Sequence, residues 1–153
     1  MEKQQIVATL KNARVSHISW VNNAIKLLEG NDLEYVNAPV ECGECDFGNW
    51  LSKQSSHLSN IPGFEEIERF HYDFHVAYEI LYYSAPIAHE PKKIFESAIK
   101  QKRKLEKLRK EYKRLEKIAI NLILKMDMVE KMVSTMSDRL FERTMVRVDV
   151  EPA

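Results

Sequence analysis

The 153-residue sequence predicts an all-α protein: a helical bundle followed by a long C-terminal helix or coiled coil. Glycine is scarce, with 4 residues, and 44% of the residues are hydrophobic. Long stretches are rich in Lys, Glu, Leu, Ile and Met, which are good helix formers. Apolar residues also recur at alternating spacings of three and four, as on one face of a helix. We therefore expect helices that pack along apolar stripes.

The first predicted helix covers residues 2–29, and Gly30 with the two polar residues after it provides a C-terminal stop signal. Its apolar stripe includes a histidine, His17, which should therefore point into the core. The stripe consists of Ile6, Leu10, Ala13, His17, Trp20, Ala24 and Leu27.

Residues 31–46 predict a short helix and a loop, because they contain Pro39, Gly43 and both cysteines of the chain. Asp46 is a suitable N-cap for a helix over about 47–58. The apolar positions of that helix are Phe47, Trp50, Leu51 and Leu58. A turn is expected at 59–63.

A third helix is predicted over residues 64–84. His71 falls on its apolar stripe, and His75 lies one turn later on the same side. Pro86 and Pro91 predict a break in the chain, because proline disrupts a helix interior. We take this break as the end of a first unit at 1–86.

Residues 92–143 predict one long helix without Gly or Pro. Its apolar positions keep a heptad spacing that is interrupted by one polar residue, Gln101, and this spacing favours a coiled coil or a long bundle helix. The expected division is thus 1–86, a long helix for dimerisation or output at 87–145, and a tail at 146–153. Within the tail, Val146–Val150 alternates like a short strand.

The net charge of zero hides an asymmetry between the two parts of the chain. Residues 1–90 hold 6 Lys and Arg against 13 Asp and Glu, a net of −7, whereas residues 91–153 hold 17 against 10, a net of +7. The basic stretch 92–117 is most simply a solvated helix face, and nucleic acid is not the expected partner because aromatic residues are sparse there. No apolar run is long enough for a membrane span and the start does not read as a signal peptide, so we expect a cytoplasmic protein.

One cysteine and three histidines can supply a closed tetrahedral zinc shell. His71 and His75 share one helix side, Cys45 precedes the short aromatic helix, and His17 lies on a facing stripe. Buried imidazoles are costly unless something satisfies them, and one shared metal would satisfy all three. The simpler alternative is that each histidine is hydrogen-bonded in the core. Trp20, Phe47 and Trp50 are expected to pack around the site and exclude water.

The order of these residues resembles a known family. His17-x2-Trp20, then Cys45-x-Phe47-Gly48-x-Trp50-Leu51, then His71-x3-His75 is similar to the chemoreceptor zinc-binding (CZB) domain of bacterial signalling proteins, over roughly residues 14–84. The resemblance implies Zn²⁺ held by His17, Cys45, His71 and His75. It also implies a small helical bundle, commonly a homodimer, attached to chemoreceptors or diguanylate cyclases, that senses zinc or oxidants such as hypochlorous acid through the thiolate.

We therefore expect a zinc-binding regulatory protein, not an enzyme, that transmits its signal through a dimeric coiled coil. Cys42, three residues before Cys45, is a possible redox partner that traps oxidised Cys45 as a disulfide. One alternative is a structural zinc-binding adaptor. A hemerythrin-like di-iron protein is a weaker alternative, because such sites need more histidines and bridging carboxylates.

Overall fold

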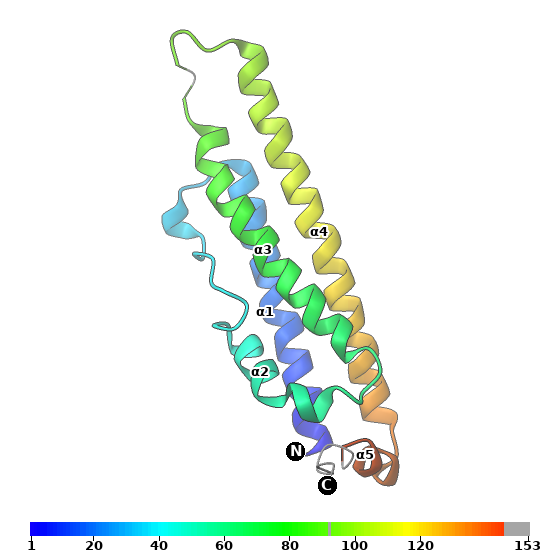
Figure 1. Ribbon diagram of the computed structural model, residues 1–153. Helices are drawn as coiled ribbons and strands as arrows, with labels where there is room; N and C mark the ends of the chain where they lie inside the picture. The colour runs from blue at the N-terminus through cyan, green and yellow to red at the C-terminus, as the bar shows by residue number, and fades with distance from the viewer. Residues whose placement is uncertain (92, 146–153) are drawn as a thin grey trace, which may run out of the picture.

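The computed structural model describes residues 1–91 and 93–145, and within them the protein is all-α, as predicted (Figure 1). The elements are α1 (Lys3–Glu29), a single 3₁₀ turn η1 (Leu33–Tyr35), α2 (Asp46–Leu58), α3 (Phe64–His89), α4 (Ala98–Thr135) and α5 (Asp138–Met145). The predicted tail at 146–153, with its alternating Val146–Val150, lies outside the described residues.

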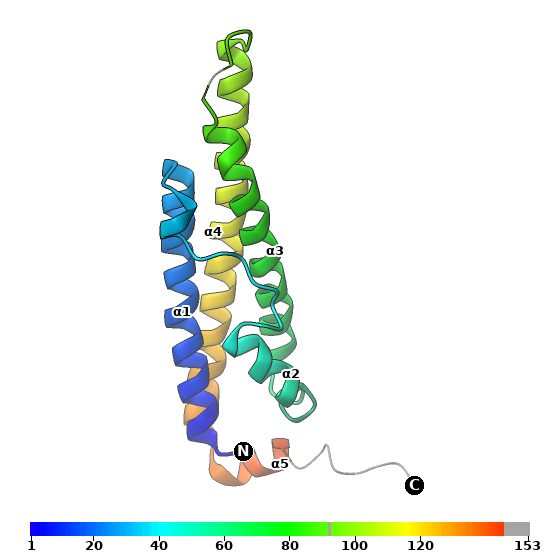
Figure 2. The same ribbon diagram turned by 90° about the vertical axis from the view of Figure 1, so that its left-hand side faces the viewer.

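Three long helices form an elongated bundle (Figures 1 and 2). Helices α1 and α3 run in the same direction, and α4 returns antiparallel along both of them. The short helix α2 covers one side of the bundle near α3, and α5 turns across the end where α1 begins. At the opposite end, α3, α4 and their connecting loop extend beyond the end of α1.

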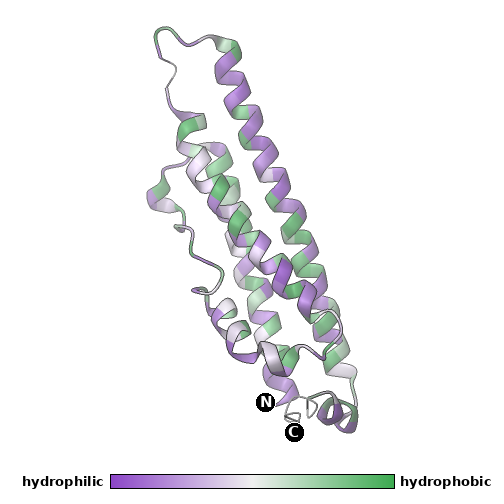
Figure 3. Ribbon diagram, in the orientation of Figure 1, coloured by the Kyte–Doolittle hydropathy of each residue, from purple (hydrophilic) through white to green (hydrophobic). Residues whose placement is uncertain are grey.

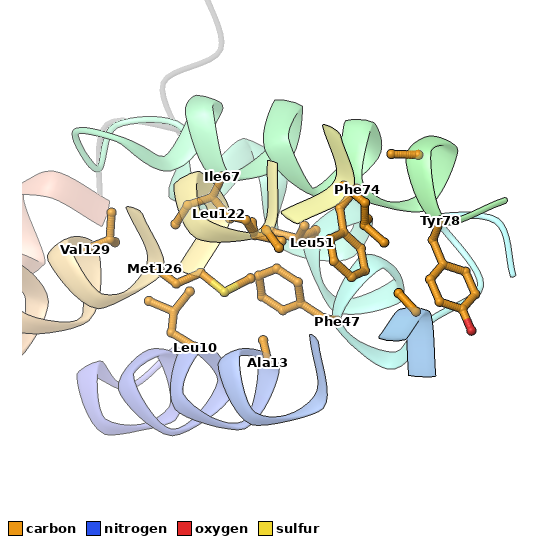
Figure 4. Close-up of a cluster of buried hydrophobic side chains, with 14 of the residues drawn as sticks. Leu10, Ala13, Phe47, Leu51, Ile67, Phe74, Tyr78, Leu122, Met126 and Val129 are labelled. Carbon is orange, nitrogen blue, oxygen red and sulfur yellow. The ribbon is translucent and has the colours of Figure 1, made fainter. Parts of the chain in front are cut away.

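The core lies where α1, α3 and α4 face one another, and α2 contributes an aromatic ring to it. Figure 4 shows Phe47 between Ala13 of α1 and Met126 of α4, with Phe74 of α3 nearby. These four side chains are at most 5% exposed. Because Phe47 follows the predicted ligand Cys45 by two residues, its burial fixes the start of α2 against the bundle.

The bounds predicted for the first helix, 2–29, are confirmed within one residue by α1. It starts with a capping box formed by Glu2 and Gln5, and it ends at Gly30, whose φ of 82° is a left-handed conformation that favours glycine. The ring of His89 packs so closely against Gly30 that an added Cβ would lie 2.9 Å from its Nδ1 atom. His89 Nε2 also lies 3.1 Å from the carbonyl oxygen of Leu28. This histidine therefore joins the ends of α1 and α3.

The predicted cap of α2 is wrong. The N-cap is Cys45, whose extended backbone lets its sulfur accept a hydrogen bond from the Gly48 N–H at 3.2 Å. Asp46 is instead the first helical residue, where its negative charge still favours the positive end of the helix dipole.

The predicted break between Pro86 and Pro91 is present, but the predicted end of the third helix at residue 84 is too early, because α3 continues through Pro86 to His89. A proline costs one backbone hydrogen bond this close to the helix end, and its own φ is helical. Ala85 and Ala88 on either side are buried, and the Ala88 carbonyl accepts a hydrogen bond from Gln101 Nε2 at 3.1 Å. Packing against α4 therefore outweighs the local breaking signal.

The single helix predicted over 92–143 is in fact two helices with different bounds. Ser97 caps α4, and α4 ends at Thr135, after which Met136 has an extended backbone. The hydroxyl of Ser137 then accepts a hydrogen bond from the Leu140 N–H at 3.3 Å, which starts α5. Serine side chains thus accept a hydrogen bond in the first turn of both helices. The heptad spacing continues through both positions, so it does not reveal these helix starts.

The predicted heptad seam of α4 is buried against α1 and α3 of the same chain. Its buried members are Leu108, Leu115, Ala119, Leu122, Met126, Val129 and Val133. Arg14 of α1 strengthens this packing, because it forms ion pairs with Asp127, at 2.9 Å, and with Glu130 of α4. The division into a unit at 1–86 and a separate helix at 87–145 stays a prediction. In the described residues, no helix is long and apolar enough to cross a membrane.

Candidate metal centre

The structure brings four of the predicted site residues to one point inside the bundle. His17 comes from α1, Cys45 from the start of α2, and His71 and His75 from successive turns of α3. One ligand atom of each residue lies within 4.8 Å of the ligand atoms of the other three. The three histidines are buried, and Cys45 is partly buried.

Spacing within the cluster is close to that of a metal shell. Nε2 of His71 lies 3.1 Å from Nε2 of His75 and 3.2 Å from Sγ of Cys45. A tetrahedral zinc with bonds of about 2.0–2.3 Å holds its ligand atoms roughly 3.3–3.7 Å apart. Small side-chain shifts are therefore enough to place four ligands around one ion.

Backbone carbonyls orient two of the imidazoles. His17 Nδ1 lies 2.7 Å from the carbonyl oxygen of Ala13, and His75 Nδ1 lies 3.0 Å from that of Val40. Because a carbonyl only accepts, each Nδ1 must carry the proton, and each Nε2 keeps a free lone pair. The Nε2 atoms are thus the ones that can bind a metal in the cluster. Such partners of the distal nitrogen are typical of metal-binding histidines.

The segment that supplies the Val40 carbonyl is itself tied to α3. The hydroxyl of Tyr78 donates a hydrogen bond to the Asn37 carbonyl at 2.7 Å, one turn beyond His75. Tyr78 is fully buried, and Trp20 packs edge-on against it at 4.7 Å between ring centroids. The loop between η1 and α2 is thus held at the position where it can orient His75.

Aromatic rings enclose the cluster, and two of the three predicted ones touch its imidazoles. Trp20 meets the ring of His75 at 5.6 Å, and Phe47 meets the ring of His71 at 5.2 Å. Trp50 instead stacks on Phe47 at 5.8 Å, and so supports that ring from behind. Phe74, which the sequence did not single out, meets His17 at 5.1 Å.

Burial keeps the cluster uncharged without a metal. It lowers the pKa of His71 to about 3 and that of His75 to about 4, helped in both cases by the neighbouring His17. Burial also lowers the pKa of His17 and raises the pKa of the Cys45 thiol. At neutral pH the three imidazoles are therefore ready to donate lone pairs, whereas the thiol must lose a proton to become a strong metal ligand.

Zn²⁺ fits this donor set. Nε2 of His17 is buried and has no hydrogen-bond partner in the described residues, which is costly for a polar atom in a protein interior. Three imidazole nitrogens and one thiolate form a zinc-type set, and within the described residues the cluster includes no carboxylate, which a di-iron site needs. An ion bound here would satisfy the unpaired nitrogen directly.

Sequence reasoning missed one backbone requirement of the site. An added Cβ at Gly48 would lie 1.5 Å from the carbonyl oxygen of Cys42 and 3.0 Å from Cε1 of His71. Only glycine allows the 40–45 loop to lie this close to α2. The sequence motif did contain a sign of this requirement. Gly48 stands in the first turn of a helix, where glycine has no intrinsic preference, so its presence there points to a close backbone contact.

Cys42 lies beside the cluster but outside it. Sγ of Cys45 lies 3.5 Å from the Cys42 carbonyl oxygen, and both thiols are free and partly exposed. A surface cavity of about 310 Å³ is lined by Cys42 and His75, among others. A second, of about 280 Å³, is lined by His17 and Cys45. Two surface cavities therefore reach side chains of the cluster. His57, on α2, is not part of the cluster.

The fold and the cluster together have the features of a helical metal-binding domain. Residues 17–80 match the family model described as the chemoreceptor zinc-binding domain, and this stretch contains all four cluster residues. This part of the chain is thus similar to the CZB domain, which confirms the resemblance seen in the sequence. A search of curated proteins found no match, and a search of solved structures found none either.

Proposed function

We propose that the protein binds one Zn²⁺ through His17, Cys45, His71 and His75 and acts as a regulatory module in bacterial signal transduction. The observation that supports this most strongly is the buried Nε2 of His17, which lacks a partner while three other ligand atoms lie within 4.8 Å. The family match supports zinc as the metal and signalling as the context.

Native mass spectrometry tests the metal site directly. We expect one zinc per chain, which a strong chelator removes and added zinc restores. Substitution His17→Ala should lower zinc affinity by more than about 100-fold, because losing a direct ligand costs more than the roughly 10–100-fold lost with an outer-shell partner. The matched control is His57→Ala, which removes a histidine outside the cluster and should leave binding unchanged. A wild-type protein that takes up no zinc when it is offered would overturn the proposal.

We further propose that Cys45 makes the site sensitive to oxidants. The Cys45 thiolate attacks the chlorine-bearing oxidant hypochlorous acid, gains its oxygen as a sulfenic acid and releases chloride. The Cys42 thiol then attacks the sulfenic sulfur, forming a disulfide and releasing water. The reaction is supported by the partial exposure of both thiols and by the contact between Cys45 Sγ and the Cys42 backbone. Oxidation removes the thiolate that the site offers to zinc, so zinc affinity falls.

A colour-forming chelator reports this reaction. Wild-type protein should release zinc on a small molar excess of hypochlorous acid, which leaves oxidant for a second step, and should bind zinc again after a thiol reductant is added. In Cys42→Ser the sulfenic acid has no resolving thiol, so further oxidation should make the loss irreversible. If the variant releases and rebinds zinc as the wild type does, Cys42 has no such role. A site whose zinc survives the oxidant in both proteins is a structural one.

We propose that the active form is a homodimer that pairs through the outer faces of α1 and α4, and that its output reaches a chemoreceptor or a diguanylate cyclase. Apolar side chains are exposed on both helices: Ile18 is 45% exposed on α1, and Ile120 and Leu124 are 52% and 62% exposed on α4. Exposed apolar residues of this kind suit a self-complementary interface. Ultracentrifugation should show a dimer in the wild type and a monomer in Leu124→Arg. A monomeric wild type at micromolar concentration would contradict this.

A further inference from the structure

The loop between α3 and α4 forms the end of the bundle that lies farthest from the start of α1 and from α5 (Figures 1 and 2). Two apolar side chains project from it into solvent: Ile94 is 94% exposed and Phe95 is 98% exposed. They are the most exposed large hydrophobic residues in the described part of the chain. Ile99, near the start of α4, adds a third at 66%. Apolar side chains clustered at one exposed end indicate an interaction surface.

Basic side chains surround this apolar end. Residues 93–110, which we call the tip segment, hold 8 Lys and Arg against 2 Glu. One of those acids, Glu96, is buried and paired with Lys104 at 2.6 Å. The start of α4 is accordingly drawn mostly in purple in Figure 3. The exposed basic residues are Lys93, Lys100, Lys102, Arg103, Lys107, Arg109 and Lys110.

A shallow groove of about 190 Å³ lies between α3 and α4 next to this end. Its apolar lining includes Ile87 of α3 and Leu108 of α4. Its basic lining comes from Lys107 and from Lys104, which is also paired with Glu96. An apolar surface beside ammonium groups suits an amphiphile with a negative headgroup, because the amines bind the phosphate while the groove takes apolar groups.

We propose that the tip segment docks on the surface of a lipid bilayer that contains anionic lipids. Ile94 and Phe95 would enter the interface between headgroups and acyl chains, and the lysines and arginines would bind the headgroups. Such binding needs no membrane-spanning helix. It concerns a surface that is separate from the metal cluster and does not depend on zinc chemistry.

Other partners explain fewer of these features. Nucleic acid would use the basic side chains, but it would leave Ile94 in water, because phosphate contacts do not bury an aliphatic side chain. An acidic protein would need a pocket shaped for two side chains that project from a narrow tip. A bilayer accommodates both the charge and the apolar pair whatever their detailed arrangement.

Sedimentation of the zinc-supplemented 153-residue protein with vesicles tests the proposal. We expect binding to vesicles of phosphatidylcholine with about 30% phosphatidylglycerol, little binding to pure phosphatidylcholine, and weakening as salt rises above roughly 0.1 M, because salt screens the lipid charge. Equal binding to both vesicle types, or no binding to either, would overturn it.

The variant Ile94→Ser/Phe95→Ser should reduce vesicle partitioning by about tenfold or more, since it removes the inserted side chains. Both residues are almost fully exposed, so circular dichroism should show an unchanged fold. The matched control is Val15→Ser/Tyr35→Ser, which removes two exposed apolar side chains, 65% and 73% exposed, from other parts of the surface and should leave partitioning unchanged. A protein that binds duplex DNA but not anionic vesicles, with the same DNA affinity in the Ile94/Phe95 variant, would show that the basic face serves nucleic acid instead.

Discussion

Gly48 lies against Cys42 so closely that a Cβ atom on Gly48 would be 1.5 Å from the Cys42 carbonyl oxygen. This contact joins the first turn of α2 to the loop that precedes it. The same added atom would lie 3.0 Å from the His71 ring. The absence of one side chain therefore brings the cysteine loop, α2 and α3 close enough to form the cluster.

Replacing this glycine tests the contact. Gly48→Ala should lower the free energy of unfolding by about 1–3 kcal/mol, as overpacking in a core does, and should weaken zinc binding by about tenfold or more because the loop must move. Urea unfolding and zinc titration measure the two effects. Gly43→Ala is the matched control in the same loop, because nothing lies within 4 Å of a Cβ placed there. Equal behaviour of the two variants would refute the close contact.

Acid should destabilise the metal-free protein. His71 and His75 have folded-state pKa values of about 3 and about 4, whereas an unfolded histidine has a pKa of about 6.5. Below about pH 6.5 the unfolded chain therefore binds more protons than the folded one. The stability that the protein has above this pH is then lost progressively as the pH falls to the folded-state pKa values of about 4 and about 3. The loss should be at most about 1.4 kcal/mol per pH unit for each histidine.

Urea unfolding in the presence of a chelator, repeated between pH 7.5 and 5, measures this loss. The variant His71→Gln/His75→Gln should show a flatter dependence, because glutamine does not titrate. An equally steep dependence in that variant would place the acid sensitivity in other groups.

Helix α4 should contribute to the stability of each chain through its buried seam. Leu122 is fully buried and Leu124 is 62% exposed, although they are only two residues apart. Leu122→Ala should cost about 2–5 kcal/mol of unfolding free energy, and Leu124→Ala should cost little in a dilute, monomeric sample. Thermal or urea unfolding of both variants measures the difference. Similar costs for the two would mean that the seam does not face α1 and α3.

The Tyr78 hydroxyl should support the metal site through the loop that it holds. Tyr78→Phe removes the hydrogen bond to the Asn37 carbonyl, worth about 0.5–1.5 kcal/mol, and frees the segment that carries the Val40 carbonyl. Zinc affinity should fall several-fold while the helical circular dichroism stays the same. Tyr83→Phe, at a site 61% exposed, is the control and should bind zinc as the wild type does. Unchanged affinity in Tyr78→Phe would separate this loop from the site.

Periodicity in the sequence was sufficient to predict the long helices, because burial alternates with the helical repeat wherever a helix packs on one side. His17, His71 and His75 fell on or beside apolar stripes, and the structure brings them together with Cys45. Helix ends were harder to predict. Pro86 is tolerated because its neighbours are buried. The chain also leaves the helix at Met136, where the heptad spacing continues, and Ser137 accepts the Leu140 N–H at the start of α5.

The supporting contacts of the site could not be predicted from residue types. The carbonyls of Ala13 and Val40 orient two imidazoles, yet every residue has a carbonyl, so no letter in the sequence marks them. The capping role of Cys45 was likewise hidden, since cysteine is a rare cap and Asp46 beside it is a common one. Long-range packing decides these features, and a single sequence does not show it.

The sulfur of Cys45 belongs to a helix terminus as much as to the metal cluster, because it accepts the Gly48 N–H at the start of α2. A change in the chemical state of that atom is therefore also a change in how α2 begins. Phe47, in the first turn of the same helix, reaches the core between α1 and α4. Cys45 and Phe47 are only two residues apart. This short segment therefore connects one reactive atom mechanically to α4, the longest helix of the bundle.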